Sequence, residues 1–406
     1  MRNKTVASGK CRFGDLTDDL LWRVLSFLPE DDALQTCVLD TRWRDLWRRT
    51  ANLSLSFDES TFPRSDRFKQ LVKLFIQLRG DSPLDKFEIS ACVDEEGKHT
   101  YTNTILLIGY ALRCQVKELL LSVNFDDEYD IGYDPIVLNV PLISQHLKIL
   151  HLERVDLKHS ALNFSHCPVL EDLKMQQCGI DARRMSSKSL KRLSITEFSY
   201  FPEEFHVRIF APGLLSLQLD NFYGLAPSLE YMPSLETAYV CLHNDCNDSC
   251  CSNMQDCEDD DCICHVYPID EGVLLHGLSN VVNLELIAGP CTEMFMYSWD
   301  LKCCPIFDKL KTLSLNEWFT SIDLLCILQH SPVLEVLTLK LRSTKKFVGA
   351  AGAQEKIEQS CVCSHLKVVN IECIKVDEGV HKILKFLSTC GIRRDQISIM
   401  ERWPSL

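Results

Sequence analysis

Basic residues are scarce in this sequence. Its 406 residues include 43 Lys and Arg against 57 Asp and Glu, for a net charge of −14. Phosphate groups are bound by basic surfaces, so this balance argues against a nucleic acid partner. No window approaches the roughly 18 uncharged apolar residues of a membrane span, and we expect none. The start of the chain lacks the apolar stretch of a secretory signal peptide, so we expect residues 1–14 to form a disordered leader.

Catalytic motifs are also missing. We find no G-x-x-x-x-G-K-S/T phosphate loop, no G-x-S-x-G elbow and no H-E-x-x-H zinc helix. The 12 histidines are scattered, and none forms an evident acid–base couple with a carboxylate. We therefore expect that the protein is not an enzyme and that it needs no cofactor and no catalytic metal.

Cysteine, by contrast, is abundant, with 21 residues. Disulfides belong to oxidising compartments, and without a signal peptide the thiols are expected to be reduced. Several cysteines, such as Cys37, Cys167 and Cys178, stand where a repeat core takes a small apolar residue. The expected compartment is the nucleus, the cytoplasm or both.

The stretch from Asp15 to Thr50 has the spacing of three short helices. The first ends at Pro29, because proline locks φ and has no N–H to donate. Its apolar stripe and those of the next two helices comprise Leu20, Leu21, Val24, Leu25, Leu28, Leu34, Cys37, Val38, Trp43, Leu46 and Trp47. So short a unit cannot bury such a surface by itself, which indicates a partner chain. The alternative is that these residues pack only onto the rest of this chain.

A repeated pattern, apolar-x-x-apolar-x-apolar, dominates the remainder of the chain. It follows a predicted strand at residues 52–57 and a predicted helix at 68–78, and several intervals match the roughly 20 to 29 residues of a leucine-rich repeat. The eleven copies are Leu84/Phe87/Ile89, Val116/Leu119/Leu121, Leu147/Leu150/Leu152, Leu170/Leu173/Met175, Leu190/Leu193/Ile195, Leu214/Leu217/Leu219, Leu235/Ala238/Val240, Val281/Leu284/Leu286, Leu310/Leu313/Leu315, Leu334/Leu337/Leu339 and Leu366/Val369/Ile371.

Each copy predicts one short parallel strand whose apolar side chains enter a shared core, followed by a return on the convex side. The predicted fold is α/β: a three-helix unit at 15–50, then a curved solenoid at 51–363 with its parallel sheet on the concave side. Residues 364–406 are expected to form a last repeat and a C-terminal cap.

One insertion interrupts the repeats. Residues 243–265 hold six cysteines and seven acidic residues. Clean C-x-x-C pairs are absent, and the acidic flanks favour a solvated, flexible loop. A metal site and redox crosslinking are the alternatives that this composition leaves open.

The opening stretch resembles an F-box, and the chain as a whole resembles the plant F-box/leucine-rich-repeat family. The residues that carry the resemblance are Leu16, Asp18 to Leu21, Val24 to Pro29, Ala33 to Leu39 and Arg42 to Trp47. Two departures are Thr17, where the family usually has proline, and Asp40-Thr41, where it has a Ser-Lys type of pair. Thr17 can still begin a helix as its N-cap, so at most a modest change in partner affinity is expected.

The end of the chain resembles the small FBD-type module that closes many of these plant proteins. The matching segments are 366–371, the helix-like 379–387 and 397–399.

The resemblance implies a substrate-recruiting adaptor subunit of an SCF-type cullin ubiquitin ligase, acting in protein ubiquitination and degradation. Its F-box would bind a Skp-type adaptor, and through it a cullin. The residues expected to bind the adaptor are Leu16, Leu20, Leu21, Val24, Leu25, Leu28, Leu34, Val38, Trp43, Leu46 and Trp47, with the two tryptophans either anchoring the partner or packing the small helical core.

The target is expected to bind the polar face of the repeats, at residues that alternate with the buried ones. The candidates are His151, Lys174, Arg192, Gln218, Tyr239 and Asn316, and Thr196 is among the other residues expected to face solvent. This mixed polar face suits a protein target, whereas the hormone and polyphosphate sites of some relatives need a basic cluster that these positions lack. A surface without a dedicated ligand, a scaffold that does not drive ubiquitination, and a metal- or redox-responsive protein acting through residues 243–265 are the alternatives.

Overall fold

The computed structural model describes residues 16–25, 36, 41–48, 52–58, 70, 73, 76–77, 79–93, 98–125, 136–242, 272–289, 295–344, 347 and 365–402. They fall into two compact units, Met1–Ile131 and Gly132–Leu406. Within the described ranges, no helix is both long enough and apolar enough to cross a membrane. The Cys-rich insertion at 243–265 lies outside the described residues.

The first unit begins with two short helices, α1 (Asp18–Leu25) and α3 (Thr41–Arg48). The Thr17 carbonyl accepts hydrogen bonds from the Leu20 and Leu21 amides, both at 3.1 Å, which puts Thr17 at the start of α1. Between the two helices only Thr36 is described, and it is helical. The three-helix arrangement therefore stays a prediction.

Three parallel strands follow in the first unit: β1 (Asn52–Asp58), β2 (Lys86–Val93) and β3 (Glu118–Phe125). The predicted helix at 68–78 is helical at each position that the structure describes, namely 70, 73, 76 and 77. Helix α5 (Lys98–Arg113) connects β2 to β3 and packs against β2. The crossover is long because parallel strands cannot be joined by a tight turn.

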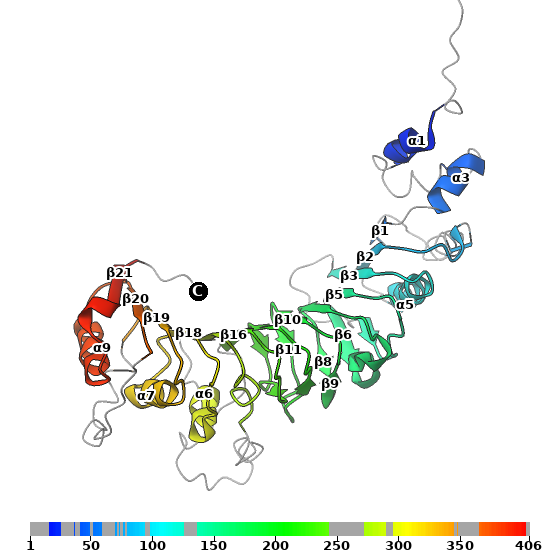
Figure 1. Ribbon diagram of the computed structural model, residues 1–406. Helices are drawn as coiled ribbons and strands as arrows, with labels where there is room; N and C mark the ends of the chain where they lie inside the picture. Colours follow the sequence, from blue (N-terminus) through cyan, green and yellow to red (C-terminus); the bar gives the residue numbers. More distant parts are fainter. Residues whose placement is uncertain are drawn as a thin grey trace, which may run out of the picture. The chain divides into compact units, whose positions relative to one another are not determined.

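The second unit is built on a parallel sheet whose strands follow one another in chain order (Figure 1). Its strands are β5 (Ile149–Glu153), β7 (Asp172–Gln176), β10 (Arg192–Thr196), β13 (Ser216–Asp220), β16 (Thr237–Leu242), β17 (Asn283–Ala288), β18 (Thr312–Asn316), β19 (Val336–Leu341), β20 (Val368–Cys373) and β21 (Ile397–Glu401). An array of single parallel strands in sequence order is the architecture of a solenoid of repeats.

The eleven predicted repeats are confirmed. In each copy the second and third apolar residues lie on a strand, and all three side chains are at most 5% exposed. Each set stacks on the next: Leu217 is in register with Leu193 on one side and with Ala238 on the other. Neighbouring copies thus bury the apolar face that one copy would leave in water.

Four strands of the sheet are followed by a residue in the same backbone conformation. Arg154, Gln177, Glu197 and Asn221 each directly follow a strand, and each has a φ between 52° and 57°. A positive φ is uncommon for residues other than glycine. Here it turns the chain out of the sheet at the end of each of these strands. The Arg154 and Gln177 amides donate to the next strand, at 2.9 and 3.2 Å, so the turns continue the hydrogen bonding of the sheet.

The return segments form the opposite layer of the second unit. In the first half of the unit, these segments form short strands that pair in three small sheets. One sheet contains β4 (Ile136–Leu138), β6 (Val155–Lys158) and β8 (Ile180–Asp181), and another contains β9 (Arg184–Ser186), β12 (Arg208–Phe210) and β15 (Ser228–Leu229). The third contains β11 (Ser199–Tyr200) and β14 (Phe222–Tyr223). Single turns of 3₁₀-helix, η3 (His159–Leu162) and η4 (Phe164–His166), lie between β6 and β7.

In the second half the layer is helical, with α6 (Phe295–Asp300), η6 (Leu301–Cys303), α7 (Ser321–Gln329), α9 (Glu378–Thr389) and η8 (Arg394–Gln396). Figure 1 shows α6, α7 and α9 on one side of the strands. Helix α7 begins with a capping box, in which Thr320 and Asp323 bond each other's backbone amides at 2.8 and 3.3 Å. Strand β20, helix α9 and strand β21 give the C-terminal segment a strand–helix–strand order.

Cysteine fills the core as the sequence predicts. Cys167 and Cys178 are at most 1% exposed, and their thiols donate to the Leu142 and Leu152 carbonyls. The cysteines whose side chains the structure describes are free thiols. Cys37 lies outside the described residues.

Asp300, at the end of α6, is 1% exposed and holds the segment before β17. Its carboxylate accepts from the backbone amides of Val273, Leu274 and Leu275 at 2.6 to 2.7 Å. Asp300→Ala leaves three buried donors without an acceptor, so we expect it to lower the free energy of unfolding by about 2 to 4 kcal/mol. Urea unfolding measures this loss, and Asp308→Ala, at an exposed position, is the control. Equal effects of the two substitutions would contradict the bracing role of Asp300.

Candidate binding surfaces

Arg42 joins the two N-terminal helices. From α3 its Nε and Nη2 donate to Oδ1 of Asp18 in α1, at 2.9 and 2.6 Å. Its Nη2 also donates to the Leu16 carbonyl at 2.5 Å, just before α1 begins. The ion pair is partly exposed and adds at most about 1 kcal/mol, but its forked geometry fixes how α1 lies against α3.

The residues predicted to bind the adaptor separate into two groups. Leu21, Trp43 and Leu46 are 1%, 8% and 3% exposed, so they are buried within the protein. This position favours the packing role for Trp43. In contrast, Leu20 is 49% exposed, and Leu16 and Val24 are partly exposed. Leu28, Leu34 and Val38 and the side chains of Leu25 and Trp47 lie outside what the structure describes.

A row of polar side chains crosses the whole sheet of the second unit. We call it the polar row, because its members are in register from strand to strand and none is buried. It consists of His151, Lys174, Ser194, Gln218, Tyr239, Glu285, Ser314, Thr338, Asn370 and Ser398. Four of the six predicted target-binding residues, His151, Lys174, Gln218 and Tyr239, belong to it. Sequence alternation thus placed them correctly on one face.

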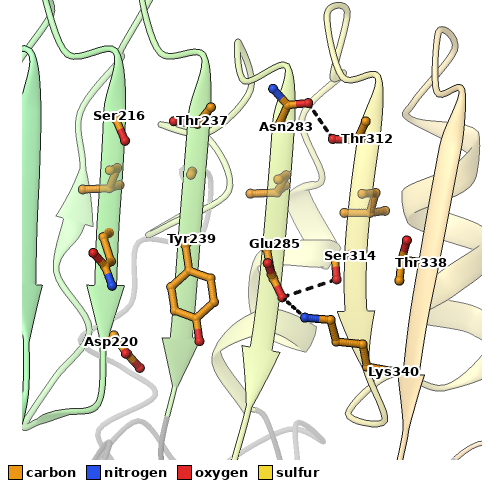
Figure 2. A pocket seen from close by; sticks show the side chains of 15 residues that line it. Ser216, Asp220, Thr237, Tyr239, Asn283, Glu285, Thr312, Ser314, Thr338 and Lys340 are labelled. Carbon is orange, nitrogen blue, oxygen red and sulfur yellow. Dashed lines mark hydrogen bonds and ion pairs between the residues drawn. The ribbon is translucent and has the colours of Figure 1, made fainter. Parts of the chain in front are cut away.

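The middle of the polar row lies in an open groove of about 650 Å³. The groove runs over strands β13, β16, β17, β18 and β19, and Figure 2 shows Tyr239, Glu285 and Ser314 side by side on its face. Polar side chains line most of the groove. The buried residues Leu217, Ala238, Leu284 and Leu313 also line it. This volume lies in the range of ligand-binding clefts.

Two charged side chains of the groove, Glu285 and Lys340, are paired with each other. Lys340 contacts Glu285 at 2.5 Å, and the two side chains are only 16% and 28% exposed. Ser314 donates to the same carboxylate at 3.4 Å, and Thr312 donates to Asn283 at 2.6 Å (Figure 2). The groove is therefore neither a basic track nor an acidic one, as the sequence predicts, and recognition would depend on hydrogen bonds and shape.

Tyr239 is the aromatic side chain of the groove. Burial, the Cys241 thiol and the Asp220 carboxylate raise the pKa of its phenol far above the ordinary value. Burial and Asp220 raise the pKa of Cys241 to about 12. Both groups are therefore neutral at pH 7, and Tyr239 offers a neutral O–H to a ligand.

Two predictions for this face need correction. Asn316, predicted to bind the target, is 2% exposed, and its amide pairs with the Ala288 backbone, accepting at 2.9 Å and donating at 2.6 Å. Thr196, predicted to face solvent, is 6% exposed. Both residues end their strands, where the chain turns and the alternation breaks down. Arg192 is exposed but lies one row away, paired with Asp172 at 2.8 Å.

Sequence reasoning missed the ion pair at the centre of the groove. Glu285 stands between Leu284 and Leu286, so the alternation that located its neighbours also marks it as an outward residue. Lys340 carries the same signal between Leu339 and Leu341. Their contact could not be read from the sequence, because it joins strands that are not adjacent.

Together, the strand array and its repeated apolar triplets define a solenoid of the leucine-rich-repeat type. No protein-family model matches the chain. Among curated proteins, an F-box/FBD/LRR-repeat protein of Arabidopsis thaliana is 25% identical, over 93% of this chain and 86% of its own length. A second one is 27% identical, over 82% and 79%. An F-box/LRR-repeat protein of the same plant is 26% identical, over 95% and 88%.

The chain is thus similar over most of its length to plant F-box/leucine-rich-repeat proteins, which supports the resemblance found in the sequence. The names of the first two also include the FBD module. Their similarity extends over most of the chain, so it covers both structural units.

The Glu285–Lys340 pair yields a stability prediction. In a double-mutant cycle with Glu285→Gln and Lys340→Met, we expect a coupling energy of about 1 to 2 kcal/mol, because the pair is largely shielded from water. The same cycle on Asp172 and Arg192, whose arginine is 57% exposed, is expected to give less than about 1 kcal/mol. Urea unfolding measures both, and equal coupling energies would show that burial does not strengthen the groove pair.

Proposed function

We propose that this protein is the substrate-recruiting adaptor subunit of an SCF-type cullin ubiquitin ligase. The helical pair α1–α3 would bind a Skp-type adaptor, and the polar row would hold a protein target. The observation that carries the proposal is the order of the chain: F-box residues come first, and a confirmed array of parallel-strand repeats follows. The F-box/LRR-repeat names of the relatives support it.

The adaptor half of the proposal is supported by Leu20. Leu20 and Leu21 are neighbours on α1, yet Leu21 is 1% exposed and Leu20 is 49% exposed. Leu21 stabilises the helical pair, whereas Leu20 presents an apolar side chain that a partner would bury. Fully burying such a side chain is worth roughly 1.5 to 3 kcal/mol.

The target half is supported by the groove. Its Glu285 and Lys340 charges are paired with each other. The remaining groups are neutral hydrogen-bond donors and acceptors, from Gln218, which is exposed, and from Tyr239 and Ser314, which are partly exposed. Polar side chains with an aromatic among them are typical of protein-binding surfaces. We further propose that the protein performs no chemistry itself and that it acts in the nucleus or the cytoplasm.

The prediction for adaptor binding compares two leucines of similar exposure on different helices. Leu20→Asp is expected to weaken binding of a Skp-type adaptor by about 10- to 100-fold, because it puts a charge into an apolar interface. Leu106→Asp on α5 is the control, since Leu106 is 42% exposed and lies outside the F-box. Calorimetric titration of the full chain with the adaptor measures both. If wild type does not bind, or if the two variants bind alike, the F-box assignment fails.

The target prediction separates a ligase subunit from a scaffold. Tyr239→Ala/Ser314→Arg alters the groove and leaves the F-box unchanged. Proximity labelling in plant cells is expected to lose groove-dependent partners in this variant and to keep the adaptor. Depleting the protein should then raise the level of those partners. Partners that stay at constant levels would favour a scaffold that does not drive degradation.

A further inference from the structure

Three metal-ligating side chains meet away from the polar groove. They are Cys304, which directly follows η6, Cys326 on α7, and His330 at the C-terminal end of α7. The two sulfurs and a ring nitrogen of the histidine all lie within 4.8 Å of one another, and all three residues are partly buried. Among the residues that the structure describes, no other three such side chains gather this closely.

Secondary structure fixes this arrangement. Cys326 and His330 are four residues apart, so one helix presents both on the same face. The Cys326 sulfur lies 3.8 Å from Nδ1 of His330. Cys304 is brought to them by the return segment after α6, and the Cys326 thiol lies 3.6 Å from the Leu301 carbonyl of that segment. The cluster therefore joins two segments of one layer.

A hydrogen bond to the backbone fixes the tautomer of His330. Its Nδ1 lies 2.8 Å from the Cys326 carbonyl, which can only accept, so Nδ1 carries the proton. Nε2 is then the nitrogen that would bind a metal, whereas Nδ1 is the one that lies 3.8 Å from the Cys326 sulfur. Histidines that bind metals commonly donate their other ring N–H to a backbone carbonyl in this way, which holds the ring in position.

We propose that Cys304, Cys326 and His330 bind one Zn²⁺ ion, which crosslinks the segment after α6 to the end of α7. Thiolate and imidazole are ligands that zinc prefers, and two sulfurs on a tetrahedral zinc are about 3.8 Å apart. The ligand atoms lie within 4.8 Å of one another, so they would need to approach by about 1 Å at most. Water would complete the coordination. The site depends neither on the F-box nor on the groove.

The test uses the full chain with the metal alone as probe. A competing site is removed by replacing the six cysteines of the insertion, Cys246, Cys250, Cys251, Cys257, Cys262 and Cys264, with serine. The reduced, chelator-treated protein is titrated with Co²⁺. We expect one equivalent to bind with the visible absorption of a tetrahedral thiolate complex, and Zn²⁺ to displace it.

Substitutions then identify the ligands. Cys326→Ser and His330→Asn are each expected to weaken Co²⁺ binding by more than about tenfold. Cys303→Ser is the matched control, because Cys303 is exposed and lies outside the cluster, and it should retain wild-type affinity. Circular dichroism of the metal-free variants verifies that each is folded. A loss in Cys303→Ser equal to that in Cys326→Ser would contradict the three-ligand assignment.

A second measurement needs no substitution in the cluster. Alkylation followed by mass spectrometry should show that Zn²⁺ protects Cys304 and Cys326 while Cys303 stays reactive. The proposal is overturned if no equivalent of Co²⁺ binds, if binding is unchanged in both cluster variants, or if Zn²⁺ protects neither thiol.

Discussion

Each strand of the second unit pairs in parallel with the next at a register that both buries the apolar side chains and assembles the polar row. Leu217, between Leu193 and Ala238, belongs to the buried layer, and Gln218, between Ser194 and Tyr239, belongs to the exposed row. Because side chains alternate with a period of two, a slip of one residue would exchange the two faces. Stability and the candidate binding surface thus depend on the same backbone hydrogen bonds.

The helical pair of the first unit follows a different rule. Its neighbouring residues Leu20 and Leu21 differ in burial, because they lie on different sides of α1: Leu20 is exposed and Leu21 is buried. Arg42 sets the position of that covering helix through its bonds to Asp18 and Leu16. The family resemblance gives this exposed leucine a meaning that burial alone does not, since it indicates which partner would cover it.

Periodic features of the fold could be predicted from the sequence, and features that depend on where strands end could not. All eleven repeats were found because their apolar triplets keep one spacing, and His151, Lys174, Gln218 and Tyr239 were placed on the polar face by alternation. Asn316 was misplaced because it stands at a strand end, where it turns inward to bond Ala288. The Glu285–Lys340 pair and the Cys304, Cys326 and His330 cluster join side chains from different repeats, whose contacts depend on return segments of unequal length.

We propose that the two units have separate roles, in which the first would bind the adaptor and the second would bind the target. Hydrogen exchange of the full chain, with and without a Skp-type adaptor, tests it most directly. We expect slower exchange in residues 16–48 and no change in the strands of the second unit. Protection that appears instead along the polar row, or no protection in residues 16–48, would contradict it.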